Sequence, residues 1–310
     1  MQSLKAAARL LAAASLCGAL AAAATAQPAR AAKYEAEDAP DANVKWADVR
    51  VEFEGNRLFT SEQLLRATNE CYEGFDQAAE EFNPDRFDYC LHRGVLAFMR
   101  RAGYVRAKLG ETRTLPLGSG LLVSVPVEEN ELYRLGRVNI EGAEHFKAER
   151  LREMLPLREG DIADAVAVLR WLEEHVKRAY ADEGFIQYDY DLKPEFRPGR
   201  DGGEGVVDFA VTVNEGRQFR LGRVEFDGPA DAPLDALREA LGLREGEVFR
   251  RREYEDGFHR LNGLELFRAD GRFEEVDRDK DVAFHIAKGA SELDLTIHLT
   301  ARGQERRAAR

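Results

Sequence analysis

The sequence has few of the residues that carry catalytic chemistry. Among 310 residues there are three cysteines and six histidines, and no two histidines stand at the spacing of a zinc-binding H-E-x-x-H motif. Gly118-Ser-Gly120 lacks the frame of a nucleophile elbow. The segment from Asp277 to Asp281 begins like a calcium loop, but Val282 stands where that loop needs glycine. We therefore expect no enzymatic activity, no cofactor and no metal ion.

Long apolar runs are missing beyond the N-terminus. Residues 10–24 are rich in alanine and leucine, follow Lys5 and Arg9, and lead into Ala24-Thr-Ala26, which is the pattern of a secretory signal peptide. A membrane anchor is the weaker alternative, because a span needs about 20 apolar residues. We predict a signal peptide at residues 1–26 and a mature chain that is soluble outside the cytoplasm.

Positive charge is in deficit. The chain has 45 Lys and Arg against 57 Asp and Glu, a formal net charge of -12. Removal of the signal peptide would also remove Lys5 and Arg9 and leave the chain more acidic. Nucleic acids and anionic lipid surfaces attract clusters of Lys and Arg. We therefore expect no nucleic-acid partner and no tight docking on membrane lipid.

Cysteine is scarce, and its placement is informative. Cys17 falls within the predicted signal peptide, which leaves Cys71 and Cys90 in an exported chain. Disulfides persist outside the cytoplasm, so we expect these two cysteines to pair; two free thiols are the alternative. Closing a loop of about twenty residues would stabilise the fold by roughly 3 kcal/mol. The bridge would pin an elongated link between two helices, a segment that could instead serve as a docking surface.

What the chain does contain is a block that occurs three times. A glycine ends the opening run of each copy and returns roughly every 87 residues, which indicates serial domains. A second glycine recurs inside each copy, and copies two and three share the sequence Leu-Arg-Glu-Gly. Tandem small modules suit a binding array better than a catalyst. The landmarks in chain order are Gly55, Gly103, Gly142, Gly160, Gly184, Gly228, Gly246 and Gly263.

Each copy has the pattern of a strand, two helices and two further strands. Val49, Val51 and Phe53 alternate with charged residues, as in a half-buried strand. Thr60 precedes Gln63 at capping-box spacing, which predicts the start of a helix. The second helix of copy two is expected to bury one stripe of its surface. That stripe comprises Ile162, Val166, Leu169, Leu172, Val176 and Tyr180.

Composition and repeat together give the domain boundaries. Residues 27–45 contain almost no large apolar residue and are expected to form a disordered leader. Short joints without proline predict modules that are linked semi-rigidly. Three modules follow the leader at 46–131, 132–216 and 217–300, and a basic tail occupies 301–310.

These residues resemble POTRA domains, the periplasmic modules of the BamA and TamA class of outer-membrane assembly factors. The resemblance covers about Trp46 to Leu299 and rests on the element order, on first strands such as Val-Asn-Ile-Glu-Gly, on Tyr180-Ala-Asp-Glu-Gly184 and on Val-Thr-Val-Asn-Glu-Gly216. It implies an α+β fold of three tandem β-α-α-β-β domains, each with two helices on a three-stranded mixed sheet. The family places a long β-barrel after its last such domain. Because this chain stops about ten residues after the third module, we expect it to lack the barrel.

The resemblance also implies a function. We expect a periplasmic protein-interaction module, associated with the outer membrane through a β-barrel partner, that binds extended clients during outer-membrane protein assembly or export. In POTRA-like folds the second strand is an edge strand that can accept a guest strand, a mode called β-augmentation. The alternative is a structural scaffold that docks one folded partner of the envelope or cell-division machinery.

The resemblance further implies which residues would bind the client. Charged side chains on the same strand could instead be guards against aggregation. The expected client-binding residues are Val105, Arg106 and Ala107 in the first module, and Ile186, Gln187, Tyr188, Asp189 and Tyr190 in the second.

Overall fold

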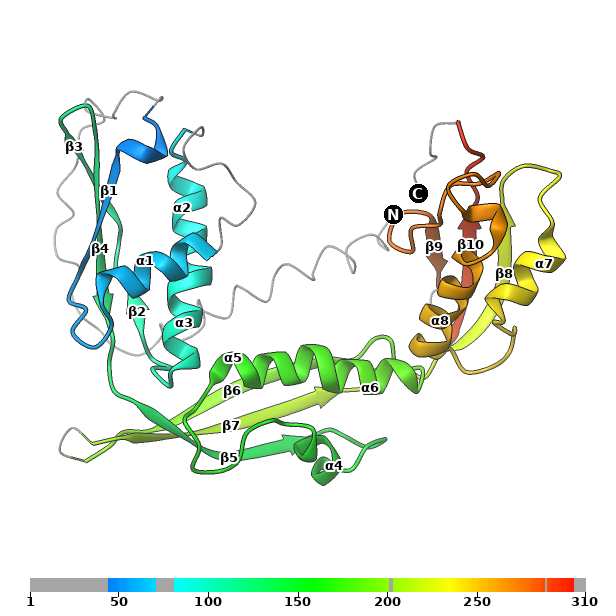
Figure 1. Ribbon diagram of the computed structural model, residues 1–310. Helices are drawn as coiled ribbons and strands as arrows, with labels where there is room; N and C mark the ends of the chain where they lie inside the picture. Colours follow the sequence, from blue (N-terminus) through cyan, green and yellow to red (C-terminus); the bar gives the residue numbers. More distant parts are fainter. Residues whose placement is uncertain (1–43, 71–80, 201–202, 288, 304–310) are drawn as a thin grey trace. The chain divides into compact units, whose positions relative to one another are not determined.

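The computed structural model describes residues 44–70, 81–200, 203–287 and 289–303 (Figure 1). The chain divides into two compact units, Met1–Leu132 and Tyr133–Arg310. The first unit contains the first module, and the second unit contains the other two. The predicted signal peptide, the leader up to residue 43 and most of the basic tail lie outside the described residues.

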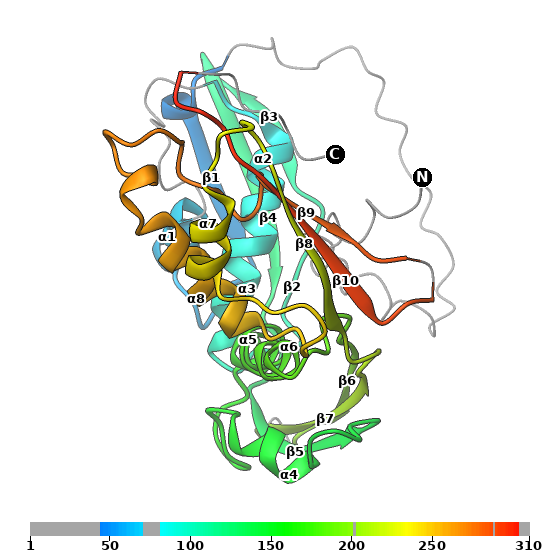
Figure 2. The same ribbon diagram turned by 90° about the vertical axis from the view of Figure 1, so that its right-hand side faces the viewer.

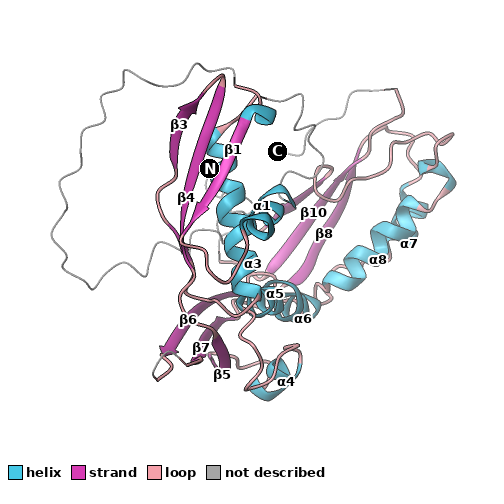
Figure 3. Ribbon diagram, turned by 60° about the vertical axis from the view of Figure 1, so that its left-hand side comes forward, coloured by secondary structure: helices cyan, strands magenta, loops and turns pink. Residues whose placement is uncertain are grey.

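The first module is an α+β domain in which helices cover one face of a mixed sheet (Figure 3). The central strand β4 runs parallel to β1 and antiparallel to β2 and β3. Leu64, Phe87, Met99 and Val123 belong to the core between the layers. The elements are β1 (Val49–Glu54), α1 (Ser61–Glu70), α2 (Pro84–Cys90), a π-helical turn (Leu91–Val95), α3 (Leu96–Arg101), β2 (Lys108–Leu109), β3 (Arg113–Leu117) and β4 (Gly120–Glu128).

The second module repeats this plan with a continuous edge strand. Its central strand β7 runs parallel to β5 and antiparallel to β6, in the order β5-β7-β6. Trp171 is buried, and its indole N–H donates to the carbonyl of Leu151 at 3.0 Å. The elements are β5 (Tyr133–Glu141), α4 (Ala148–Glu153), α5 (Ala165–Arg170), a π-helical turn (Trp171–Val176), α6 (Lys177–Asp182), β6 (Asp189–Arg197) and β7 (Gly205–Asn214).

The third module has the same order with shorter strands. Figure 2 shows β8, β10 and β9 side by side, with β10 parallel to β8 and antiparallel to β9. Its core includes Phe219, Phe258 and Leu295. The predicted order of strand, two helices and two strands is therefore confirmed in the second and third modules. In the first module the strand that follows the helices is divided into β2 and β3, which gives a four-stranded sheet. The elements are β8 (Arg220–Asp227), α7 (Leu234–Leu241), α8 (Arg251–Asn262), β9 (Val282–His285) and β10 (Glu292–His298).

The glycine that ends each first strand lies against the backbone of the central strand. A Cβ at Gly142 would stand 2.3 Å from the carbonyl oxygen of Val213, and one at Gly55 would stand 2.6 Å from that of Val127. Both glycines have positive φ, 77° and 89°, which side chains rarely adopt. Glycine recurs at these two positions because the end of the first strand lies too close to the backbone of the central strand for a side chain.

A carboxylate at the end of the central strand holds the loop that precedes the first helix. Glu215 Oε1 accepts hydrogen bonds from the backbone N–H groups of Glu144 and His145, each at 2.8 Å, and from the Tyr180 hydroxyl at 2.6 Å. Glu129 does the same for the backbone of Leu58 and Phe59 in the first module. The Asn-Glu-Gly motif is thus a structural clamp.

Two local predictions have different outcomes. The capping box is confirmed, because Thr60 N–H donates to Gln63 Oε1 at 2.8 Å and Gln63 N–H donates to Thr60 Oγ1 at 3.2 Å. The stripe predicted for the second helix is partly wrong. Ile162 precedes the helix, where it forms an isolated bridge with Arg134 and is 46% exposed, and Leu169 on α5 is 36% exposed. The π-helical turn at 171–176 adds a residue to one turn, so the buried residues before it are Ala165 and Val168.

The second and third modules are joined by hydrogen bonds and ion pairs. Phe219 N–H donates to the carbonyl of Gly184 at 2.8 Å, and Arg250 Nη1 lies 3.2 Å from Glu183 Oε2. Arg178 Nη2, at the end of the second module, lies 2.7 Å from Glu255 Oε2 on α8. These contacts lie within the unit Tyr133–Arg310, and the semi-rigid linkage stays a prediction.

We predict that acid loosens this joint. Burial alone would raise the pKa of Glu255, but hydrogen bonds and charge from Arg251 and Arg178 outweigh it and hold the pKa below its ordinary value of 4.5. A lowered carboxyl pKa stabilises the folded state above 4.5, and this stabilisation is lost as the pH falls through the lowered value. The protection factor of the Phe219 amide, which is the intrinsic exchange rate divided by the observed rate at the same pH, should therefore fall below pH 4.5 in the wild type. In Glu255→Gln the protection factor should be lower at pH 7 and depend less on acid; equal protection in both proteins at every pH would contradict the prediction.

Candidate functional site

Each sheet has two edges, and in the second and third modules the edge at the first strand is covered at its start by the chain itself. The connector between the two helices hydrogen-bonds along β5: Leu135 N–H donates to Asp161 O, and Gly160 N–H donates to Leu135 O, both at 2.8 Å. In the third module Leu221 on β8 makes the same two bonds: its N–H donates to Glu247 O, and its carbonyl accepts from the N–H of Gly246. The repeated Leu-Arg-Glu-Gly motif therefore forms the cover of this edge, a role that the sequence analysis did not assign.

The opposite edge is formed by β6 in the second module and by β9 in the third. Among the residues that the structure describes, β6 pairs only with β7 and β9 only with β10. A strand at a sheet edge presents one row of backbone groups to solvent. These two strands, with β2 and β3 of the first module, are the candidate functional site.

The geometry of β6 shows which backbone groups point outward. In an antiparallel pair, alternate residues direct both N–H and C=O toward the partner strand. Pro194 has no N–H to give to β7, and the N–H of Tyr190 donates to the side chain of Asp189 at 2.9 Å. Tyr190 and Pro194 therefore direct their backbone groups away from β7. Leu192 lies between them in the same alternation, so its N–H and C=O also point away from β7.

In β9 a backbone hydrogen bond shows which residues direct their N–H and C=O groups toward β10. His298 N–H donates to the carbonyl of Asp281 at 2.8 Å, which places Asp281 in the set that faces β10. Phe284 therefore belongs to the outward set. Its side chain is 49% exposed and contacts the rings of Phe249 and Tyr254.

The edge strand of the first module is interrupted. Gly110 N–H donates to the carbonyl of Pro126 at 2.8 Å, but Pro126 has no N–H to return the bond. Beyond this point the register shifts by one residue, from Leu109 opposite Val127 to Arg113 opposite Ser124. Such a shift is a β-bulge, and it divides the edge into β2 and β3.

The predicted client-binding residues coincide with these edges only in part. Asp189 and Tyr190 lie in β6, but Val105, Arg106, Ile186 and Gln187 lie in turns, and Ala107 and Tyr188 precede their strands. The reason is the interior glycine, which has a φ of 90° at Gly103 and 87° at Gly184. The turn that follows is closed by Ala107 N–H to Tyr104 O and by Tyr188 N–H to Phe185 O. The strands therefore start later than predicted, at Lys108 and Asp189.

Several of these residues also have structural contacts. Ile186 packs against the core of the third module. Tyr188 is 7% exposed and stacks on Tyr180 with ring centroids 4.9 Å apart. Arg106 accepts a hydrogen bond at its carbonyl from Asn130 Nδ2. These contacts give the positions a structural role in the turn and in the joint between modules, and their binding of a client stays a prediction.

The inner side of β6 is fixed to the second helix by tyrosines. The Tyr190 hydroxyl donates to Glu173 Oε1 at 2.8 Å. Burial, and then this hydrogen bond and the charge of Glu173, raise the pKa of Tyr190. Burial also raises the pKa of Tyr188. Both phenols therefore remain neutral near pH 7 and serve to anchor the strand.

The predicted disulfide lies partly outside the described residues. Cys90 is disulfide-bonded and its side chain is buried at the end of α2. Cys71 falls in the segment 71–80, which the structure does not describe. The pairing of Cys71 with Cys90 therefore stays a prediction.

Within residues 44–70, 81–200, 203–287 and 289–303, no group of three or more His, Cys, Asp or Glu side chains could hold a metal ion. No helix in the described ranges is long and apolar enough to cross a membrane.

Comparison with known proteins identifies the second module directly. Residues 133–216 match the POTRA family, described as "Surface antigen variable number repeat". The chain is 25% identical over 224 residues to a putative outer membrane protein assembly factor of Treponema pallidum, which covers 70% of this chain and 26% of that protein. It is 24% identical over 259 residues to the outer membrane protein assembly factor BamA of Neisseria meningitidis, with 81% and 30% covered. The chain thus spans less than a third of the length of either relative.

The fold agrees with these matches. The crystal structure of POTRA domains 3–5 of Haemophilus influenzae BamA superimposes with a TM-score of 0.61 at 18% sequence identity, covering 84% of this chain and 96% of that one. The shared element order extends the likeness from residues 133–216 to all three modules. Residues 133–216 therefore match the POTRA family, and the fold of all three modules is that of tandem POTRA domains.

Proposed function

We propose that this chain is a periplasmic protein-interaction module in outer-membrane protein assembly or export. It binds extended client segments, or a β-barrel partner, by adding them as strands to its sheet edges. The observation that carries the proposal is the asymmetry of the edges: in the second and third modules the connector hydrogen-bonds to the start of β5 and β8, whereas β6 and β9 pair on one side among the described residues. Relatives that are named as assembly factors support the biological setting.

The chemistry of β6 favours weak and reversible binding. Main-chain hydrogen bonds recognise an extended shape rather than one sequence. Along this edge, however, Pro194 removes one donor, and the Asp189 side chain occupies the N–H of Tyr190. Exposed charges such as Lys193 discourage pairing between two copies of the chain. An edge with few open donors holds a client and then releases it, as transfer to a partner requires.

Amide hydrogen exchange followed by NMR tests this mechanism at single residues. Adding an extended peptide of alternating apolar and polar residues should slow the exchange of the outward amides of Leu192 and Phe284 by about tenfold at saturation, because a new hydrogen bond protects them. The amides of Asp191 and Lys193 face β7 and serve as internal controls that should not change. Unchanged exchange at both outward amides in the presence of bound peptide would overturn the proposal.

The scaffold alternative predicts a different pattern. A single folded partner would protect side chains and loops over a broad surface, without selecting alternate amides along β6. The alternation itself therefore distinguishes the two functions.

A further inference from the structure

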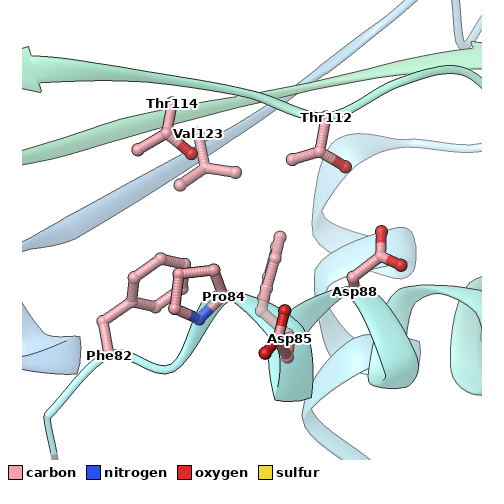
Figure 4. Close-up of a pocket in the computed structure, with 8 residues that line it drawn as sticks. Phe82, Pro84, Asp85, Asp88, Thr112, Thr114 and Val123 are labelled. Atoms are coloured by element: carbon pink, nitrogen blue, oxygen red, sulfur yellow. The ribbon is translucent and has the colours of Figure 1, made fainter. Parts of the chain in front are cut away.

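The first module has a groove beside its edge strand. It measures about 230 Å³ and lies between Thr114 and Val123 on the strands, with Thr112 just before β3, and the segment Phe82–Asp88 at the start of α2. Figure 4 shows Thr112 and Thr114 on the strand side, opposite Pro84, Asp85 and Asp88 on the helix side. The β-bulge opposite Pro126 turns the edge strand at this place.

The walls of the groove differ in character. Phe82 and Phe87 form an aromatic wall, with ring centroids 5.6 Å apart. At the rim stand Asp85 and Asp88. Asp88 has a weak contact with His92, at 3.8 Å, and its side chain is 57% exposed. The groove therefore combines an aromatic wall with two carboxylates at its rim.

The opposite face of the same strand carries two exposed leucines. Leu115 and Leu117 are 45% and 47% exposed, and they alternate with Thr114 and Pro116, so they lie on the opposite face of the sheet from the groove. A strand added to β3 would place alternate side chains beside these leucines. The side chains between them would point toward Asp85 and Asp88.

We propose that the β3 edge of the first module selects extended client segments that alternate apolar residues with a basic residue. The inference rests on the proposed function and deepens it. The apolar side chains contact Leu115 and Leu117, and the Lys or Arg side chain reaches the carboxylates of Asp85 and Asp88. Charge complementarity of this kind discriminates between partners more than it raises affinity.

Three matched peptides test this selection on the three-domain protein. Each has eight residues, alternates apolar and polar positions, carries a photoreactive leucine and differs only in having Lys, Gln or Glu at one central position. Binding is measured as crosslinking to residues 113–117, mapped by mass spectrometry. We expect the Lys peptide to bind about fivefold more tightly than the Gln peptide, and the Glu peptide to bind more weakly than either.

Variants locate the origin of the preference. In the double variant Asp85→Asn, Asp88→Asn the preference for Lys should disappear, while the affinity for the Gln peptide stays unchanged. The matched control Glu62→Gln, Glu70→Gln on α1 removes the same charge from the same module and should keep the preference. A preference that survives in the aspartate variant, or is absent from the wild type, would overturn the proposal. Equal binding of all three peptides would leave β-augmentation standing, whereas no binding of any peptide to any edge would refute the proposed function as well.

A photoreactive residue at Leu115 in the protein without peptide examines the other possible occupants. We expect no self-capture. Capture of a second copy, or of residues 27–43 of the same chain, would show that the edge serves self-association or self-occupation, and would overturn the assignment to clients.

Discussion

Replacing Gly142 by alanine is expected to lower the free energy of unfolding of the second module by more than about 3 kcal/mol. The new Cβ would stand 2.3 Å from the carbonyl oxygen of Val213. That oxygen belongs to the central strand β7, which pairs on both sides and cannot move away cheaply. The φ of 77° at Gly142 adds strain for any side chain. Urea unfolding followed by fluorescence of the buried Trp171 measures the effect.

Gly160→Ala is the matched control for this prediction. Gly160 has a φ of 94°, but a Cβ there would meet nothing within 4 Å. Gly160→Ala should therefore lower the free energy of unfolding only by the backbone strain, about 1–2 kcal/mol. A similar loss in both variants would show that φ alone, and not the approach to β7, makes the marking glycine necessary.

Replacing Glu215 by alanine is expected to destabilise the second module by about 3 kcal/mol. One carboxylate oxygen accepts three hydrogen bonds, two from the backbone of Glu144 and His145 and one from Tyr180. The Tyr180 side chain is fully buried, so its hydroxyl would lose its partner without gaining water. Removing an acceptor from a buried donor costs more than the net value of the bond.

Two variants separate the contributions to this clamp. Tyr180→Phe removes one of the three bonds together with its donor and should cost about 1 kcal/mol. Glu215→Gln keeps an acceptor oxygen and should fall between the two. If Glu215→Ala were no more destabilising than Tyr180→Phe, the loop before α4 would not depend on the carboxylate.

The features that could be predicted from the sequence are local or repeated. Thr60 and Gln63 form a capping box within four residues, and the alternation of Val49, Val51 and Phe53 indicates a strand. The element order followed because three copies show the same landmarks. Which face of the second helix is buried could not be derived. The π-helical turn at 171–176 shifts that face, and its Trp171 hydrogen-bonds to the carbonyl of Leu151, which lies on another helix.

The candidate site was harder to predict for a physical reason. The pattern of Ile186, Tyr188 and Tyr190 alternates as in a strand, but the glycine at 184 with positive φ starts a turn that uses up the first residues. Which edge is covered depends on hydrogen bonds between Gly160 and Leu135, 25 residues apart. The bulge in the first module follows from Pro126 on a neighbouring strand. Such pairings are not visible in a single segment of sequence.

Site-specific photocrosslinking in the native envelope tests the central claim most directly. Probes at Asp191 and Lys193 stand on β6 with their side chains exposed, and a control probe at Glu159 stands on the connector that covers the opposite edge. The account predicts that the β6 probes capture many outer-membrane proteins or their precursors and that the control captures few. Capture of one folded soluble partner from β6, or equal capture from Glu159, would contradict the account.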